Sequence, residues 1–461
     1  MTRRAGASLA IAAVAVCLLP AAAAGQAMPG DGPHTSASIS TRARQARVEL
    51  VGADGHPLDG TGVSVAVVDT GVDATHPSFR LGDGSTKVVR QVTTLTCAAE
   101  PLVGHDPSCV SDLDAGGDSD AGHGGHGTFA ASTALGNELE LVDGTHVDGV
   151  APGARLVMIV TTATLVSVET AFAWVLEHHA EPCGSGVAAS VCPPIRVVSA
   201  SWGANSAYFD DVERRLAAAG VVVAWANGNQ GGDGSTSASN PTPARDPTPG
   251  VLAVASYDDK GTGTRDGELS STSARGAVND PTTWPDISAP GVNILGACRP
   301  YHAVCEAVGT HPKDGPGPDD RATFYVASGS SWAAPAVAGV VAVLFQARPN
   351  ATAAEIDDAL KATAYRYGGP AAYATRGSYP SSFDKGAGLI DAYAAAVLLG
   401  AKPVLTAATA PRPADVRAAA AQGASGTHPA TGGAPLPPLA GGGVLALALL
   451  LLRGRARVRP A

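Results

Sequence analysis

The 461-residue sequence contains few aromatic and few charged residues. Aromatic side chains make up 5% of it and charged side chains 16%, and methionine occurs only three times. A core built from large rings is therefore excluded, and we expect Val, Ala, Leu and Ile to fill the interior. Glycine (56 residues) and proline (34 residues) are abundant, which indicates many turns. The length suffices for one large domain with a sizeable core, or for two smaller domains.

The sequence also lacks a long basic stripe. Its 31 Lys and Arg residues are outnumbered by 41 Asp and Glu residues, which gives a formal net charge of −10 at pH 7. Binding to nucleic acid requires clustered positive charge, so we do not expect nucleic acid as a partner. An ordinary acidic surface is enough to explain the balance.

Cysteine is scarce, and no Cys-x-x-Cys spacing occurs. Cys17 lies in the apolar N-terminal segment, and six cysteines remain after it. An even number suits an oxidising location and favours disulfides over zinc ligation. Among the connectivities open to six cysteines we expect nearest-neighbour pairing, namely Cys97–Cys109, Cys183–Cys192 and Cys298–Cys305.

The first residues have the layout of a secretory signal. Two arginines precede the apolar run Ala7–Leu19, and the small residues Ala22–Ala24 offer a cleavage site. The run is short for a membrane anchor. We therefore expect residues 1–24 to be a signal peptide on an exported protein, followed by a flexible N-terminal segment over residues 25–41.

The central part of the chain alternates apolar strands with helical patterns. The nearly continuous apolar runs predict strands that are buried on both faces, as in a parallel sheet. These runs are 62–68, 154–160, 195–200, 221–226 and 250–256. Helical spacing occurs at 168–179, 209–219, 331–347 and 353–363. The alternation predicts an α/β fold over residues 42–400, a three-layer sandwich with a mostly parallel central sheet flanked by helices.

The composition changes after residue 400. Residues 401–433 are rich in Ala, Pro, Thr and Gly, and they predict a flexible linker because they cannot bury enough apolar surface to offset chain entropy. Within residues 434–461, the apolar run Leu439–Leu452 precedes four arginines. This order is typical of a stop-transfer segment whose basic tail stays inside, so we expect association with a membrane.

Three segments each contain one member of an acid, base and nucleophile set. Asp69 ends the first apolar strand, where α/β folds place working groups. His126 precedes a stretch of small residues, and Ser331 begins an apolar helix whose free N–H groups can face an oxyanion. Taken singly, the three are also explained as a turn cap, a structural histidine and a helix N-cap. His123 is a competing histidine, although the glycines after it disfavour a helix.

With their neighbours, these three residues resemble the subtilisin family of serine proteases. The chain order of acid, histidine and serine is the family's order. The similar segments run from about Gly60 to Val397 and are 65–72 with 75–77, 125–128, 149–154, 199–203, 288–292 and 329–335. The resemblance implies the family's fold and a serine endopeptidase in which Asp69 orients His126, His126 is the general base and Ser331 is the nucleophile.

The same resemblance implies an oxyanion donor and a substrate cleft. The pattern Gly-Asn-x-Gly places the oxyanion asparagine at Asn229. One chain edge should pair with an extended peptide substrate as an added strand; it consists of Ser201, Trp202 and Gly203. One pocket wall should enclose the substrate side chain before the scissile bond; it consists of Ala226, Asn227 and Gly228. Asn227 and Trp332 depart from the smaller residues usual at their positions, so Asn227 is expected to narrow the pocket or to make it more polar.

The overall layout resembles the membrane-anchored mycosins of bacterial type VII secretion. The chain before Asp69 is short for a folded pro-segment, and a cysteine-bearing insertion lies at residues 97–120. The resemblance implies an endopeptidase tethered on the outer face of the cell membrane. Residues 429–433 followed by the apolar run also resemble a sortase sorting signal, with His428 in place of the expected leucine. A retained anchor and attachment to the cell wall through Thr431 both remain open.

No cofactor is required by this chemistry, and the expected partners are protein or peptide substrates of a monomeric enzyme. Bound calcium is common in the family. Four carboxylates of the insertion could supply the hard oxygen ligands that calcium prefers, but a solvated acidic loop explains them as well, and no metal ligand is assigned; they are Asp112, Asp114, Asp118 and Asp120.

Overall fold

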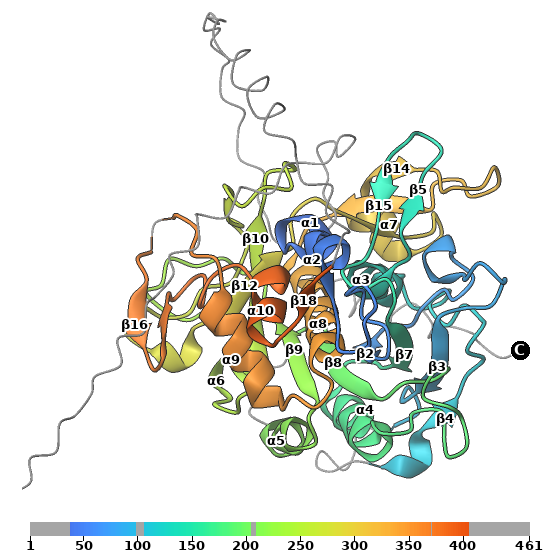
Figure 1. Ribbon diagram of the computed structural model, residues 1–461, viewed down its shortest axis with the longest axis horizontal. Helices are drawn as coiled ribbons and strands as arrows, with labels where there is room; N and C mark the ends of the chain where they lie inside the picture. Colours follow the sequence, from blue (N-terminus) through green and yellow to red (C-terminus); the bar gives the residue numbers. More distant parts are fainter. Residues whose placement is uncertain (1–36, 98–105, 204–208, 370, 405–461) are drawn as a thin grey trace, which may run out of the picture. The chain divides into compact units, whose positions relative to one another are not determined.

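The computed structural model describes residues 37–97, 106–203, 209–369 and 371–404 (Figure 1). They lie within one compact unit that ends at Val404. The predicted signal peptide, the linker after Val404 and the C-terminal apolar segment lie outside the described residues.

A large mixed sheet forms the centre of the described part of the chain. It has nine strands in the order β11-β10-β9-β8-β2-β7-β3-β4, with β12 paired to β10 as well. The strands are β2 (Ser64–Asp69), β3 (Val88–Thr93), β4 (Ser111–Asp112), β7 (Arg155–Val160), β8 (Ile195–Ala200), β9 (Val222–Ala226), β10 (Val251–Asp258), β11 (Glu268–Leu269) and β12 (Ile287–Pro290).

Most pairs of neighbouring strands in this sheet are parallel. β2 pairs in parallel with β7 on one side and with β8 on the other, and β3, β9, β10 and β12 extend the parallel part. The short strands β4 and β11 pair antiparallel. The carboxyl ends of β2, β7 and β3 are level, because Asp69 lies opposite Val160 and Val160 lies opposite Thr93.

Both faces of the sheet are covered by helices because both side-chain rows of each central strand are apolar. Along β2, Val65 and Val67 pack toward α8 (Ser330–Ala347) in one hydrophobic cluster. Ala66 and Val68 pack in another cluster with α4 (Leu165–His178) and α5 (Asp210–Ala218), which lie next to each other in Figure 1. The predicted three-layer α/β sandwich is confirmed.

Helix α8 is the central helix of the fold. It is buried along almost its whole length and contacts the central strands. Its length and apolar composition would suffice to cross a membrane, but 94% of the apolar segment is buried in the protein. It is therefore a core helix, and it is the one helix in the described part of the chain that meets these criteria.

The remaining elements cover the edges of the sandwich. Helices are α1 (Ala37–Ser40), α2 (Ala43–Glu49), α3 (His126–Leu135), α6 (Pro241–Arg245), α7 (Ala303–Val308), α9 (Ala353–Thr363) and α10 (Ala392–Leu398). Smaller sheets pair β1 (Leu50–Val51) with β18 (Lys402–Pro403), β5 (Leu139–Glu140) with β6 (His146–Val147), and β16 (Ala374–Arg376) with β17 (Tyr379–Ser381). A further sheet joins β13 (Ile294–Ala297), β15 (Phe324–Ala327) and β14 (Thr310–Lys313).

Two features differ from the sequence expectations. Residues 37–41 were expected to be flexible, but α1 is fixed there because the Ser38 hydroxyl donates to Asp148 (2.7 Å). Strand β3 was not expected, because Arg90 and Gln91 interrupt its apolar run. The Gln91 side chain is buried, and its NH₂ group donates to three backbone carbonyls of residues 114–117, which satisfies this group inside the fold.

The three expected disulfides are present. Cys97–Cys109, Cys183–Cys192 and Cys298–Cys305 each close a short loop. Nearest-neighbour pairing is therefore confirmed.

Candidate active site

Asp69 is the last residue of β2, at the carboxyl edge of the sheet. It is 3% exposed, and its Oδ1 accepts a hydrogen bond from the Thr70 N–H (2.7 Å). The chain then turns at Gly71, which has a positive φ of 143° and leaves no room for a Cβ beside Ser119. The buried strand and the tight turn together fix the direction of the carboxylate.

His126 is the first residue of α3, which begins directly beside Asp69. The preceding Gly125 adopts φ 80°, and an added Cβ there would meet the ring of His302. The Nδ1 atom of His126 lies 2.8 Å from Asp69 Oδ1. The predicted acid and base are therefore in direct contact, with the Nδ1 proton donated to the carboxylate and Nε2 left as the base nitrogen.

Electrostatics at this pair favour a protonated imidazole. Burial alone lowers the pKa of His126, but the charge of Asp69, the hydrogen bond to it and the charge of Asp120 outweigh burial and raise the pKa above the ordinary 6.5. The side chain of His126 is 26% exposed. The imidazole is therefore partly accessible, and the nearby carboxylates raise its pKa.

Ser331 is the second residue of α8, and its two neighbours connect it to the other site residues. On one side, the Ser330 N–H donates to Asn229 Oδ1 (2.8 Å). On the other side, the indole of Trp332 packs against the ring of His126, with centroids 4.9 Å apart. In the chain, Ser331 therefore stands between a residue bonded to Asn229 and a residue packed on His126, at a helix end whose first N–H groups have no partner within the helix.

Asn229 follows β9, and its side chain is exposed. Its Oδ1 accepts from Ser330, so the other amide atom, Nδ2, is the donor of this side chain. The Gly228 N–H in turn donates to the Ser330 hydroxyl (3.2 Å). The asparagine segment and the serine segment are thus bonded to each other in both directions.

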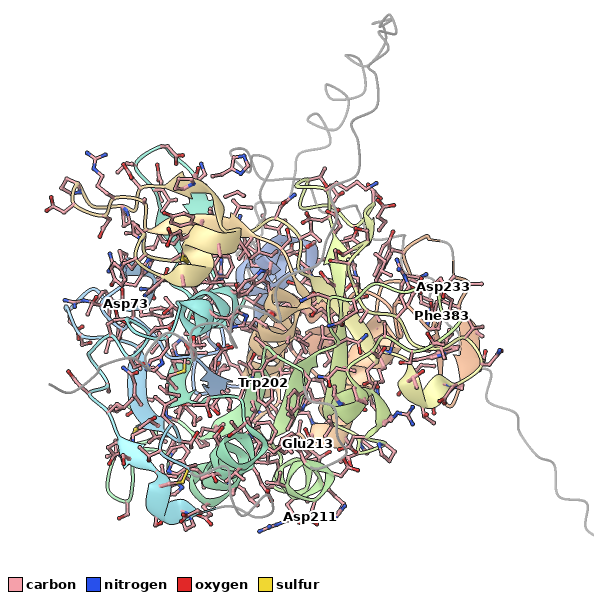
Figure 2. The ribbon with its side chains drawn as sticks, turned by 180° about the vertical axis from the view of Figure 1, so that it is seen from behind. Asp73, Trp202, Asp211, Glu213, Asp233 and Phe383 are labelled. Carbon is pink, nitrogen blue, oxygen red and sulfur yellow. A yellow bond between two sulfur atoms is a disulfide. The ribbon has the colours of Figure 1, made fainter. Side chains whose placement is uncertain are left out.

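The predicted substrate-binding residues follow the carboxyl ends of β8 and β9. Ser201, Trp202 and Gly203 continue β8, and the Trp202 indole donates to the Val68 carbonyl (3.0 Å). Trp202 also meets Trp225 edge to face at 4.8 Å, near the middle of the view in Figure 2. Ala226 ends β9, and Asn227 and Gly228 follow it.

Asn227 does not behave as a simple lining residue. Its side chain is fully buried, and its amide donates to Ser239 Oγ (3.2 Å) and to the Ala274 carbonyl (2.8 Å). The Asn227 amide therefore points into the protein and supports the predicted pocket wall from its buried side.

Sequence reasoning missed Asn240, which joins the two walls. Its Nδ2 donates to the Ala226 carbonyl (3.1 Å) and makes a longer contact with the Trp202 carbonyl (3.5 Å). The side chain also lies within 4.0 Å of the space that a Cβ on Gly203 would occupy. No sequence motif pointed to this residue, because its partners come from two other strands.

The four carboxylates suggested for calcium do not share one site. Asp112 pairs with Arg90 (2.6 Å), and Asp118 accepts from the Tyr301 hydroxyl (3.0 Å). Both oxygens of Asp120 are occupied by protein donors. The bonds of these groups to the protein explain them without an ion.

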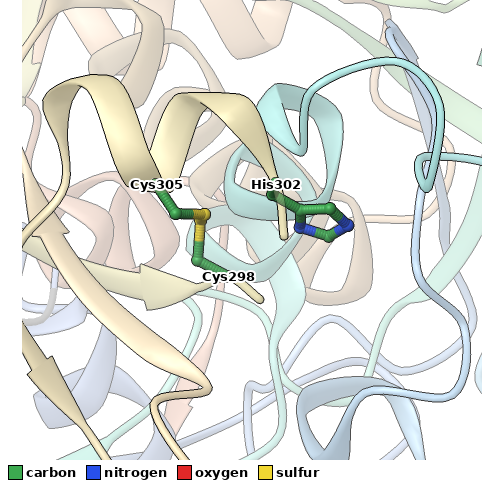
Figure 3. Close-up of side chains that lie close together, drawn as sticks. All are labelled: Cys298, His302 and Cys305. Atoms are coloured by element: carbon green, nitrogen blue, oxygen red, sulfur yellow. A yellow bond between two sulfur atoms is a disulfide. The ribbon is translucent and has the colours of Figure 1, made fainter. Parts of the chain in front are cut away.

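Two other groups within the described residues have ligand atoms close enough to hold a metal. In the first, the sulfurs of Cys298 and Cys305 are joined in a disulfide, and Figure 3 shows the His302 ring directed away from them. The second is Asp210, Glu213 and Asp246. Burial raises the pKa of Glu213 well above its usual range, so that its neutral form is favoured there.

The chain is similar in sequence to known serine proteases. The family model described as the subtilase family matches residues 60–388. Serine protease AprX of Bacillus subtilis is 26% identical over 344 residues, which cover 71% of this chain and 67% of AprX. Fervidolysin of Fervidobacterium pennivorans is 31% identical over 323 residues, which cover 67% of this chain but only 38% of fervidolysin.

The crystal structure of fervidolysin, a keratinolytic enzyme related to subtilisin, is similar in fold. The two structures superpose with a TM-score of 0.50 and 28% sequence identity, over 74% of this chain and 43% of fervidolysin. A parallel sheet with a paired acid and histidine at its carboxyl edge, and a serine at the start of the central helix, defines a subtilisin-like serine endopeptidase. The chain belongs to the subtilase family.

Proposed function

We propose that Asp69, His126 and Ser331 form the catalytic triad of this endopeptidase and that Asn229 completes its oxyanion hole. The observation that carries the proposal is the 2.8 Å contact between Asp69 and His126, beside a helix start that bears Ser331. Such a carboxylate holds the imidazole in the tautomer that leaves Nε2 free to accept a proton.

In this mechanism His126 first acts as general base. Nε2 takes the proton of the Ser331 hydroxyl while Oγ attacks the scissile carbonyl carbon, and the carbonyl oxygen becomes an oxyanion. Asn229 Nδ2 and the Ser331 N–H donate to that oxyanion. His126 then gives the proton to the leaving amine, the C–N bond breaks, and an acyl-enzyme remains, which water hydrolyses by the reverse sequence of proton transfers.

Substrates are proteins or peptides, and we propose that they bind in extended form. Residues 201–203 continue β8 beyond its last ladder pair, which suits the addition of a peptide as a further strand. The side chain before the scissile bond would then lie between Trp202 and Ala226, beside Asn240.

Export and tethering remain part of the proposal. The three disulfides support an oxidising location. The N-terminal signal and the C-terminal apolar run support a protein held at the outer face of the membrane or wall. A mycosin-like role, in which the enzyme processes itself or one secretion partner, follows from the layout alone. A catalytically silent peptide-binding protein is the alternative from another class.

Labelling with a fluorophosphonate tests the proposed triad. We expect the folded protein to be labelled at Ser331, and Ser331→Ala to abolish labelling and to lower turnover roughly 10⁶-fold. Ser328→Ala is the matched control, because Ser328 is exposed and its hydroxyl accepts from the Asn293 N–H, away from the proposed triad in the hydrogen-bond network of the described residues. Labelling that persists in Ser331→Ala would assign the nucleophile elsewhere, and no labelling of the folded wild type would support the silent protein. Casein and the purified Ser331→Ala protein, offered as substrates, separate general proteolysis from self-processing.

A further inference from the structure

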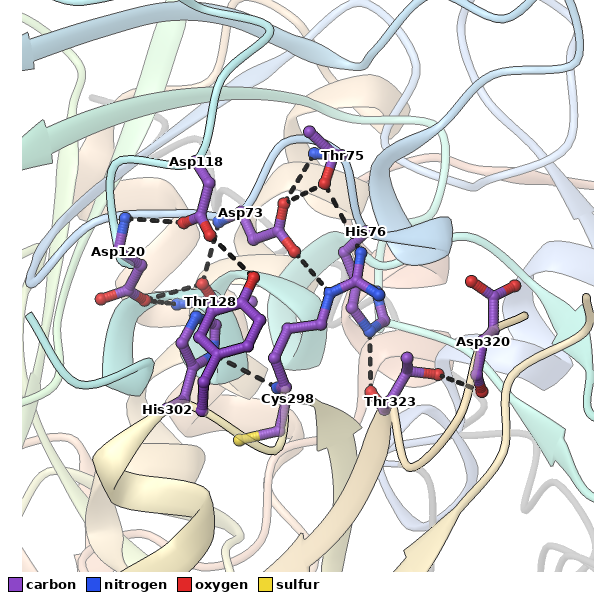
Figure 4. Close-up of polar contacts among 12 residues, drawn as sticks. Asp73, Thr75, His76, Asp118, Asp120, Thr128, Cys298, His302, Asp320 and Thr323 are labelled. Carbon is purple, nitrogen blue, oxygen red and sulfur yellow. Dashed lines mark hydrogen bonds and ion pairs between the residues drawn. The ribbon is translucent and has the colours of Figure 1, made fainter. Parts of the chain in front are cut away.

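Asp120 is a fully buried carboxylate six residues before His126 in the sequence. Its Oδ1 accepts from the Thr70 hydroxyl (2.8 Å) and from the Gly125 N–H (3.0 Å). Its Oδ2 accepts from the Thr128 N–H (2.9 Å) and from the Thr128 hydroxyl (2.7 Å). Figure 4 shows the bonds to Thr128 within the surrounding polar network.

These four donors connect the acid to the base. Thr70 directly follows Asp69, whereas Gly125 and Thr128 lie on either side of His126. The Thr70 hydroxyl also accepts from the Gly127 N–H (2.8 Å), so the turn after Asp69 is bonded to α3 at a second point. One carboxylate therefore fixes the separation of the two segments that carry the Asp69–His126 contact.

The bonding pattern requires both terminal atoms of the Asp120 side chain, Oδ1 and Oδ2, to be hydrogen-bond acceptors. The two N–H groups can only donate, and the Thr70 hydroxyl, which accepts from Gly127, has its own proton left for Asp120. An ionised carboxylate accepts all four bonds, whereas an amide would turn its NH₂ group toward donors. Asp120 also satisfies an N–H in the first turn of α3, whose N-cap Gly125 has no side chain.

We propose that Asp120 is a positioning residue of the proteolytic reaction, which holds His126 within hydrogen-bond reach of Asp69 by joining the turn after Asp69 to the start of α3. The inference rests on the proposed catalytic roles of Asp69, His126 and Ser331. Asp120 touches neither the substrate nor the reacting atoms, and it acts on the reaction only through His126.

The charges around His126 allow the role to be distinguished from mere structural support. Asp69 and Asp120 both raise the pKa of His126. Two more titratable groups lie nearby. Asp118 accepts from the Asp120 N–H (2.9 Å), and the His302 side chain packs against Gly125, the residue before His126. Removing the charge of Asp120, or moving His126 away from Asp69, shifts the pKa of His126 downward. A loss of global stability does not.

The test compares Asp120→Asn with Asp114→Asn. Asp114 is an exposed carboxylate of the same insertion, and its Oδ1 accepts from Gly116, which an amide oxygen can still do. We expect Asp120→Asn to lower kcat about 10- to 100-fold with little change in KM, since small misplacements of catalytic groups cost rates of this order. The acidic limb of kcat/KM should move to lower pH, and Ser331 should react more slowly with a fluorophosphonate. Asp114→Asn should match the wild type in all three measurements.

The outcomes distinguish a failure of the proposed triad from a failure of the positioning role of Asp120. If the wild type is not labelled at Ser331, the proposed triad fails. If the wild type is labelled and Asp120→Asn keeps its kcat, acidic limb and labelling rate, the positioning role is overturned. Should Asp120→Asn not fold, Thr70→Val removes the hydroxyl that donates to Asp120 and accepts from the Gly127 N–H, and Thr70→Ser restores it. Slow labelling in the valine variant with recovery in the serine variant supports the role, whereas wild-type rates in both overturn it.

Discussion

The imidazole of His126 packs against the indole of Trp332, with ring centroids 4.9 Å apart and planes inclined by 37°. Trp332 is 2% exposed and also packs against Phe129 of α3 at 4.1 Å. Because Trp332 directly follows Ser331, this contact joins the helix of the nucleophile to the helix of the base. The large residue at this position is therefore part of the contact between α3 and α8.

Replacing Trp332 tests this packing. Trp332→Ala should lower the free energy of unfolding by about 3–5 kcal/mol and reduce kcat, because a large cavity opens beside His126. Trp332→Phe should cost much less, since the indole N–H is buried without a partner among the described residues, so that losing it breaks no bond. Urea unfolding and peptide hydrolysis measure both effects. A loss near zero in Trp332→Ala would show that the ring contact is unimportant.

The raised pKa of His126 predicts the direction of the pH dependence. Catalysis needs the neutral imidazole, so kcat/KM should fall as the pH drops through a value above 6.5, the ordinary pKa of histidine. Asp69→Asn removes the charge that raises this pKa and also favours the wrong tautomer. We expect its acidic limb at lower pH and its kcat about 10⁴-fold lower. A pH profile of peptide hydrolysis measures both, and an unmoved limb in Asp69→Asn would contradict the assignment of the base.

The position of Asn240 predicts that the pocket for the substrate side chain before the scissile bond is narrow. Asn240 is 6% exposed and occupies the space between Trp202 and Ala226. Asn240→Gly should therefore increase kcat/KM for substrates with large apolar side chains at that position, by roughly 10-fold or more for each methylene group admitted. A peptide library analysed by mass spectrometry reads the preference. Asn279→Gly, at an exposed asparagine, is the control, and an unchanged preference in Asn240→Gly would place the pocket elsewhere.

The strands and the helix that position this site could be predicted from the sequence, because they depend on local patterns of apolar residues. Strands such as β2 and β8 are continuous apolar runs, and α8 is an apolar helix of small residues, so their positions follow from composition and period. The contact of Asp69 with His126 was expected from the resemblance of their segments to the subtilisin family, and it forms where the end of β2 meets the start of α3.

The supporting contacts could not be predicted in the same way. Asn240 contacts Trp202 from 38 residues away, and Asp120 meets Thr70 from 50 residues away. These pairs exist only after the sheet has aligned its strand ends, and a buried asparagine or aspartate carries no periodic signal in the sequence. From the sequence, Asp120 was explained either as part of a solvated acidic loop or as one of four carboxylates that could bind calcium, whereas both of its oxygens accept hydrogen bonds inside the protein.

His76 lies in the turn after Asp73 and is fully buried. Its Nε2 donates to the Thr323 carbonyl (2.7 Å), and its Nδ1 accepts from the Ser78 N–H (3.1 Å). These two bonds require the neutral imidazole, with the proton on Nε2. Burial lowers the pKa of His76 to about 4, with Arg299 acting in the same direction and the Thr323 carbonyl and Asp73 opposing it.

The lowered pKa of His76 makes the fold sensitive to acid. Below pH 6.5 the unfolded chain takes up a proton that the folded state refuses until about pH 4, so stability declines as the pH falls through this window. The loss from this one group amounts to about 3 kcal/mol. His76→Gln, which has no titrating ring, should show a shallower decline of the unfolding free energy between pH 7 and 4, although its stability at neutral pH is lower. Urea unfolding of both proteins across this range measures the slope, and parallel curves would show that His76 is not the group responsible.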